Sequence, residues 1–163
     1  MDSLNWSSEM SLDIPALDLA HQRFLLKLSD IASAPDSEFN LKYFSLIEEL
    51  ERDFKEEEDL MEAMQFYEIH PHREQHARVL YALHKVIPAV LRGEYDTAKQ
   101  TLELIPKWFL FHLSAVDKLV SIWFKLKNAG VTVDTWYDEQ NSVVPPFIRP
   151  GGSSPVQSAT AGR

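Results

Sequence analysis

The stretch EELERDFKEEEDLMEAM, residues 48–64, decides the fold because an apolar stripe runs through it at helical spacing. Leu50 and Met64 belong to this stripe, whose members recur every three or four residues as in an amphipathic helix. Asp53 and Glu57 fall on the same face. The alternative is a solvated charged face, which suits the neighbouring carboxylates. Ionisable groups in a core are usually paired or bound to a metal, so these two need such a partner.

Three other segments combine an apolar face with inward ionisable groups. His72 and His76, in HREQH, are four residues apart and therefore stack on one helical face. Such a pair can bind one ion, although exposed pairs also occur by chance. His21, in LDLAHQRFLL, lies on an inward face, where a hydrogen-bonded core histidine is the alternative.

His112 and Asp117, in HLSAVD, are five residues apart and match one helical face less well. They reach a shared centre if the carboxylate bridges sideways. Seven ionisable groups then converge from four helices. Bound metal, in the form of two iron ions inside a helical bundle, is the simplest explanation.

The predicted fold is all-α, an antiparallel up-down-up-down four-helix bundle preceded by an extended N-terminal arm. Pro88 should kink or shorten the third helix, and Pro106 should bend the fourth or divide it into two. The predicted helices span residues 16–32, 41–64, 71–91 and 95–128. The predicted organisation is an arm (1–15), a bundle (16–130) and a C-terminal extension (131–163) whose distal part is disordered.

Composition restricts the chemistry. The sequence contains no cysteine, which excludes disulfides, iron–sulfur clusters and thiolate nucleophiles and leaves nitrogen and oxygen ligands for any metal. The net charge of −9 argues against nucleic acid or an anionic membrane as the main partner. The N-terminus has neither the basic nor the apolar region of a secretory signal, so we expect a cytoplasmic protein. Neither a nucleophile elbow nor a phosphate-binding glycine motif occurs.

In chain order the candidate ligands follow the pattern H … D-F-x-x-E … H-x-x-x-H … W-x-x-x-H-x-x-x-x-D. This pattern resembles the hemerythrin family, specifically the bacteriohemerythrins. The resemblance covers residues 4 to about 125 and includes W-S-x-E-M-S-L-D-I-P-x-L-D-x-x-H-Q, F-Y-E-I-H-P-H-R-E-Q-H and W-F-L-F-H-L-S-A-V-D.

The resemblance implies two non-haem irons, joined by a solvent-derived oxo or hydroxo bridge, that bind dioxygen reversibly. It implies a first iron held by three histidines and a second, with an open position, held by His21. Glu57 and Asp117 would bridge the two ions. The three histidines of the first iron would be His72, His76 and His112. Phe54, Met61 and Phe109 would help to wall the oxygen pocket, whereas Trp108 and Phe111 either join them or are simply core.

Asp53 departs from the family, which has a second histidine there on the oxygen-binding iron. Asp53 either ligates directly, acts through water, or leaves the second iron weakly held. An anion in place of a neutral ligand favours the diferric state and fast autoxidation. From the resemblance we expect an oxygen carrier, store or sensor rather than an enzyme, with nitric oxide or peroxide as other possible ligands. The alternatives are a di-iron oxidase or peroxidase, and a signalling bundle with a degenerate or mononuclear site.

Overall fold

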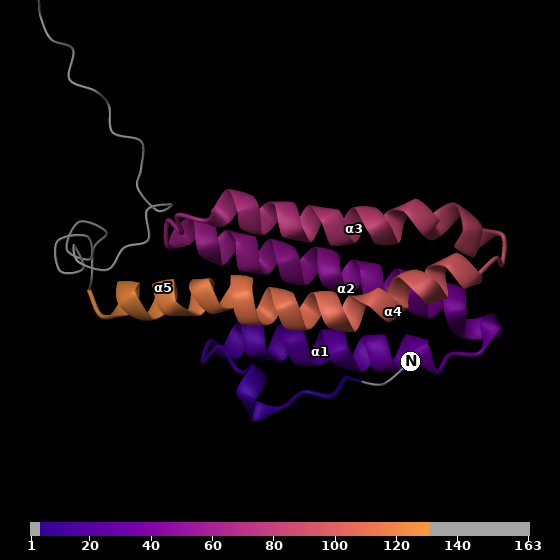
Figure 1. Cartoon of the computed structure of the whole chain (residues 1–163), viewed down its shortest axis with the longest axis horizontal. Coiled ribbons are helices and arrows are strands. Elements are labelled where there is room, and N and C mark those ends of the chain that lie inside the picture. Colours follow the sequence, from indigo (N-terminus) through magenta and orange to yellow (C-terminus); the bar gives the residue numbers. More distant parts are fainter. Residues whose placement is uncertain (1–3, 131–163) are drawn as a thin grey trace, which may run out of the picture. The chain divides into compact units, whose positions relative to one another are not determined.

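The apolar faces of the helices meet in one core. The computed structural model describes residues 4–130. No strand occurs within that part of the chain. In chain order the elements are η1 (Ser8–Met10), α1 (Pro15–Ala32), α2 (Asp36–Ala63), α3 (Ile69–Leu91), α4 (Asp96–His112), the π-helical turn η2 (Leu113–Asp117) and α5 (Lys118–Asn128). Because α4, η2 and α5 follow one another without a connecting loop, they form a single fourth rod (Figure 1).

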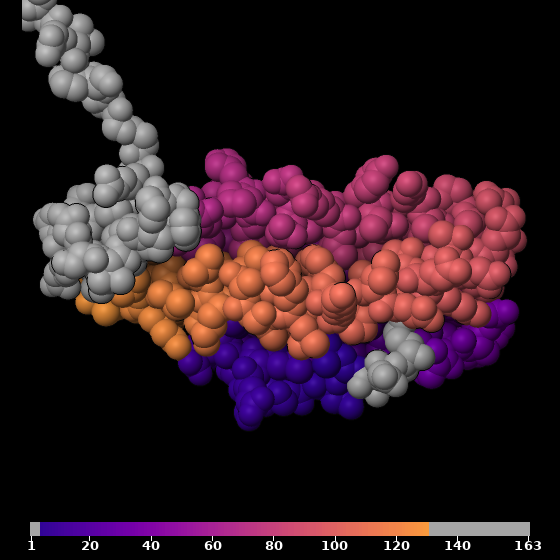
Figure 2. Space-filling model, in the orientation of Figure 1, coloured from indigo at the N-terminus to yellow at the C-terminus, as the bar shows by residue number. Residues whose placement is uncertain are grey.

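Short connections join these helices, so each packs antiparallel to the one before it. Contacts run from α1 to α2, from α2 to α3 and from α3 to α4. Figure 2 shows the α4–α5 rod, in salmon and orange, lying between α3 in magenta and α1 in indigo. The predicted all-α four-helix bundle is confirmed.

The second helix begins earlier than the sequence pattern predicted. It starts at Asp36 rather than near residue 41. Asp36 and Glu38 lie in its first turn, where negative charge is favourable to the helix dipole. Phe39 and Tyr43 are buried and extend the apolar stripe towards the N-terminus of the helix. The segment therefore has both the start signal and the buried face of a helix.

Neither internal proline ends its helix. Pro88 lies inside α3, which continues to Leu91, and Pro106 lies inside α4. The fourth rod instead changes geometry at the π-helical turn Leu113–Asp117. The predicted interruption of this rod therefore exists, but it lies several residues beyond the proline to which it was assigned.

The N-terminal arm packs on the bundle through its last residues. Leu12 and Ile14 are buried, and the Ser121 hydroxyl on α5 donates a hydrogen bond of 2.6 Å to the Leu12 carbonyl. The Leu12 amide donates to Asp18 in the first turn of α1, at 2.8 Å. These bonds hold the entry to α1, the helix that carries His21.

The predicted C-terminal extension, residues 131–163, lies outside the described residues. Within residues 4–130, none of the helices combines the length and the apolar character that crossing a membrane requires.

Candidate metal centre

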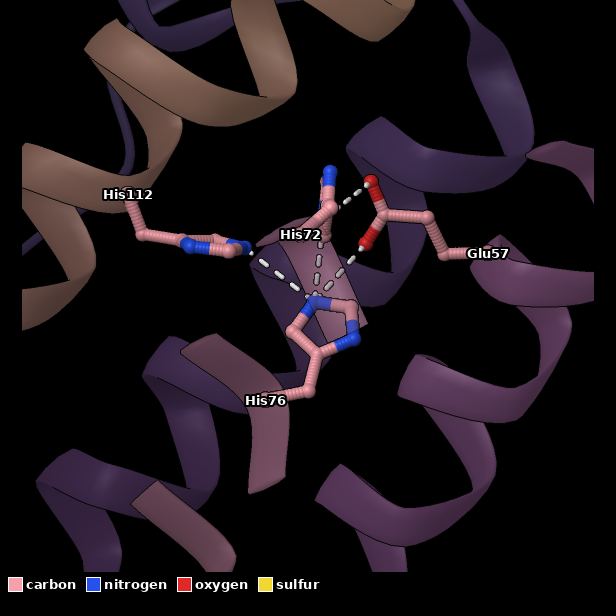
Figure 3. Close-up of side chains that lie close together, drawn as sticks. All are labelled: Glu57, His72, His76 and His112. Carbon is pink, nitrogen blue, oxygen red and sulfur yellow. Dashed lines mark hydrogen bonds and ion pairs between the residues drawn. The ribbon is translucent and has the colours of Figure 1, made fainter. Parts of the chain in front are cut away.

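Three histidine side chains meet in the core of the bundle. His72 and His76 extend from one face of α3, and His112 is the last residue of α4. The Nε2 atom of His76 lies 3.1 Å from Nε2 of His72 and 3.1 Å from Nε2 of His112 (Figure 3). Nitrogens about 2.1 Å from one metal ion are about 3.0 Å apart when they occupy adjacent octahedral positions. The spacing fits three ligands of one ion.

Glu57 of α2 completes this group from the opposite side. Its Oε1 lies 3.5 Å from Nε2 of His72, and its Oε2 lies 3.6 Å from Nε2 of His76 (Figure 3). Its side chain is almost wholly buried. Ligand atoms from Glu57, His72, His76 and His112 all lie within 4.8 Å of one another, a grouping compact enough for one metal ion.

The π-helical turn explains how His112 and Asp117 meet although they are five residues apart. A π-helix bonds each residue to the fifth one along, so positions five apart align as positions four apart do in an α-helix. Oδ1 of Asp117 lies 2.9 Å from Nε2 of His112. From the spacing alone we expected the Asp117 carboxylate to bridge sideways to the shared centre. The backbone provides the alignment instead.

Asp117 also connects the three-histidine group to His21. Its Oδ1 lies 3.4 Å from Nε2 of His72, whereas its Oδ2 lies 3.5 Å from Nε2 of His21 on α1. The two oxygens of one carboxylate thus face two sets of histidines, as a bridging ligand requires. The His21 ring also packs edge-on against Phe109, with 5.4 Å between centroids.

Asp53 is placed differently from the other predicted ligands. Its Oδ1 accepts a hydrogen bond of 3.0 Å from Nη2 of Arg23, a residue of α1. Its Oδ2 is buried and accepts no hydrogen bond from any described residue. Asp53 does not belong to the compact group formed by the three histidines and Glu57. The contacts described above link six of the predicted ligands, Asp117 among them, into one cluster, whereas the seventh, Asp53, pairs with Arg23.

Burial controls the protonation of the histidines. It lowers the pKa of His72 to about 4, and burial followed by the neighbouring imidazoles lowers the pKa of His76 to about 2. Burial likewise lowers the pKa of His21. His21, His72 and His76 are therefore neutral at pH 7, which is the form that binds a metal.

The pKa values of the two central carboxylates shift in opposite directions. Burial, followed by the charge of Asp117, raises the pKa of Glu57 well above its usual value. Burial alone would raise the pKa of Asp117 too, but the nearby His112 and the other imidazoles outweigh it and lower that pKa to about 2. Glu57 is the group that most lacks a positive partner.

The donor set fits a bound cation. Glu57 Oε1 and both Asp117 oxygens are buried and accept no hydrogen bond from the described part of the chain. Buried carboxylate oxygens are costly unless they are paired or coordinate a metal, and a cation among the histidines would satisfy them. Histidine nitrogen and carboxylate oxygen suit iron, manganese or zinc.

A small cavity adjoins the His21 side of the cluster. Its volume of about 20 Å3 exceeds the roughly 10–15 Å3 that one water-sized molecule needs. Phe54 and Phe109 line it, but Met61, although buried, does not, and Phe111 is exposed. The lining also includes His21, Asp53, Glu57 and Trp108.

Glu58 is a functional candidate that the sequence analysis missed. It was assigned to the solvated face of the helix, but its Oε1 lies 3.0 Å from Nδ1 of His76 and its Oε2 accepts a 2.9 Å bond from Nε of Arg73. A carboxylate on the far nitrogen of a ligating histidine fixes the ring orientation and its tautomer. The only local signal is its position next to Glu57.

We expect Glu58→Gln to weaken metal binding by about 10- to 100-fold, because the amide orients the His76 ring less strongly. Metal titration of the purified variant measures this. Glu62→Gln is the matched control, since Glu62 also pairs with Arg73 but is not bonded to His76. Equal affinities for the two variants would contradict the role assigned to Glu58.

Comparison with known proteins supports the same class of site. No family model matches the chain. No solved structure matches it either. The bacteriohemerythrin of Ralstonia nicotianae is 28% identical over 123 residues, which cover 76% of this chain and 90% of that protein. That match, with the four-helix bundle and its buried histidine and glutamate group, supports a hemerythrin-like chain with a candidate metal site.

Proposed function

We propose that the chain holds two iron ions and binds dioxygen, as an oxygen carrier, store or sensor. The observation that supports this most directly is Asp117, whose two oxygens face His72 and His112 on one side and His21 on the other. In this proposal His72, His76, His112 and Glu57 hold the first ion. His21 and Asp117 Oδ2 supply donors to the second. Bound iron would supply the electrons that reversible dioxygen binding requires.

The chain's own residues prepare a small, dry site for that ligand. The cavity beside His21 has room for one very small molecule rather than an organic substrate. Phe24, Phe54 and Phe109 line it, and such apolar walls exclude the water that would carry protons to the site. These residues favour binding of a diatomic molecule over reactions that consume it.

Iron reconstitution tests the proposal. Protein loaded anaerobically with ferrous iron should retain close to two irons per chain. It should gain a visible absorption band in air and lose the band when oxygen is removed, over repeated cycles. Iron content by elemental analysis and the spectrum through the cycle are the measurements. A protein that takes up no iron, or one that changes once and never reverts, would contradict reversible oxygen binding.

A di-iron oxidase or peroxidase is the second candidate, and the carboxylate content of the site favours it. Asp53 lines the same cavity as Glu57, where the family has a histidine, and burial raises its pKa although the hydrogen bond from Arg23 opposes this. Sites rich in carboxylates stabilise ferric iron. Steady oxygen or peroxide consumption in the presence of a reductant, with a persistent ferric resting state, would favour the enzyme.

We expect Asp53→His to slow the irreversible oxidation of the reduced protein in air, because a neutral donor replaces an anion next to the second ion. The measurement is the rate at which the reduced, iron-loaded variant becomes ferric under air. Asp59→His, an exposed change on the same helix, is the control. An unchanged rate in the Asp53 variant would show that Asp53 does not set the redox preference.

A further inference from the structure

Arg23 joins α1 to two buried carboxylates of α2. Its Nε donates to Glu49 Oε1 at 2.9 Å, and its Nη2 donates to Asp53 Oδ1 at 3.0 Å. Both carboxylates are more than nine-tenths buried, whereas Arg23 itself is about one-third exposed. The guanidinium therefore reaches inward from the surface of the bundle, on the helix that carries His21.

The two oxygens of Asp53 have different surroundings. Oδ1 is held by Arg23, while Oδ2 is buried and accepts no hydrogen bond from the described residues. Asp53 lines the same small cavity as His21 and Glu57. An oxygen held by an arginine beside one that is unpaired and next to a cavity is the arrangement of a carboxylate oriented to bind a cation or a solvent molecule.

We propose that Arg23 is a positioning residue for the second metal position: it orients Asp53 towards the cavity and offsets its charge. This inference rests on the proposed function. The Arg23–Asp53 pair is neutral as a unit, so it resembles a neutral ligand in net charge although it contains a carboxylate. How strongly Asp53 favours ferric iron is then controlled by Arg23.

The neighbouring cations do not take over this role. Lys27 lies 3.4 Å from Glu49 Oε2 and pairs with that carboxylate rather than with Asp53. Arg52 is half exposed and pairs with Glu49, and its distance to Asp53 Oδ1 is 3.6 Å. Without Arg23, Glu49 therefore keeps two partners, whereas Asp53 keeps only the more distant and more solvated one.

The test compares Arg23→Gln, Asp53→Asn and the double variant, all loaded with ferrous iron. Arg23→Gln should lower the midpoint potential of the iron and speed its oxidation in air on the order of tenfold, because an uncompensated anion stabilises ferric iron. Asp53→Asn should shift both quantities in the opposite direction. The double variant restores the net charge of the wild type, so its potential should return close to the wild-type value.

Two further variants separate charge from general damage. Lys27→Gln removes a cation from Glu49 without touching Asp53 and should leave the potential unchanged. Arg23→Lys keeps the charge and should stay near the wild-type potential even if its affinity for the second metal equivalent falls. Shifts of equal size in the midpoint potentials of Arg23→Gln and Lys27→Gln would overturn the proposal. A double variant whose midpoint potential is as low as that of Arg23→Gln would overturn it too.

Thermal unfolding of the metal-free protein gives a readout that needs no iron. Arg23→Gln should lower the melting temperature because it leaves Asp53 buried and poorly paired. In an Asp53→Asn background, Arg23→Gln should lower the melting temperature by clearly less. Additive effects would overturn the pairing on which the inference depends. If the wild type takes up no iron, the proposed function fails; if it does and the variants show no shift, only this inference fails.

Discussion

His76→Ala should abolish tight metal binding, lowering affinity by at least about 100-fold. His76 is central to the cluster, because its Nε2 lies 3.1 Å from the corresponding atoms of both His72 and His112. Without it, the compact group of Glu57, His72, His76 and His112 loses one of its four ligands. Metal titration with zinc, which cannot be oxidised, measures the affinity of the variant without interference from iron chemistry.

The matched control for this change is His84→Ala. His84 lies two turns further along α3 and also contacts a glutamate of α2, with Nε2 2.8 Å from Glu51 Oε1. Its side chain is 46% exposed, whereas that of His76 is 2% exposed. Each variant loses an imidazole that contacts a glutamate of α2, but only His76 faces the cluster. Similar metal affinities in the two variants would refute the assignment of this centre.

Loss of the His76 ring also removes packing, and the design must separate that effect from loss of a ligand. The ring stacks on Phe54 with 3.8 Å between centroids and nearly parallel planes. His76→Gln keeps more of this volume and a hydrogen-bonding group but is a poorer metal ligand. We expect it to fold like the wild type by circular dichroism and still to lose most of its metal affinity.

Glu57→Gln should raise the stability of the metal-free protein and lower that of the metal-loaded protein. Without metal, Glu57 is a buried carboxylate beside Asp117, and its pKa is raised by burial and by that second charge. Removing its charge should stabilise the metal-free form by about 1–3 kcal/mol at pH 7. With metal, the same change removes a ligand and should lower stability. Urea unfolding with and without zinc measures both effects.

The pH dependence of this gain has a defined sign. The folded protein holds a proton on Glu57 more tightly than the unfolded chain does, so this residue favours folding below its unfolded pKa and loses that effect as pH rises. The advantage of Glu57→Gln should therefore be largest at pH 7 and shrink towards pH 4.5. Glu56→Gln, at an exposed neighbour, should show neither the gain nor its pH dependence.

The histidines act in the opposite sense over part of this range. The pKa values of His72 and His76 are lowered on folding, so these residues favour the folded state above pH 6.5 and lose that effect as pH falls. The Glu57→Gln and Glu56→Gln variants both keep these histidines. Glu57 contacts both imidazoles, so the Glu57→Gln effect includes its interaction with them, whereas Glu56→Gln keeps those contacts and serves as the reference.

Local periodicity was sufficient to predict the helices and most of the inward groups. An α-helix places residues three and four apart on one face, so Asp53 with Glu57 and His72 with His76 could be assigned to shared faces from spacing alone. The model confirms that all four are buried. Whether they bind iron stays a prediction that the metal titrations test.

Tertiary structure decided the contacts whose partners lie far apart in sequence or off the regular helical repeat. The alignment of His112 with Asp117 depends on a π-helical turn, and a spacing of five residues does not by itself predict such a turn. The pairing of Asp53 with Arg23 joins residues thirty positions apart on different helices. The orientation of Glu58 towards His76 depends on how α2 and α3 face each other. Helical periodicity is a local property, so the face that each side chain occupies could be predicted from the sequence. Rotation and stagger between packed helices depend on the whole core. Which side chains meet therefore became clear only in the folded bundle.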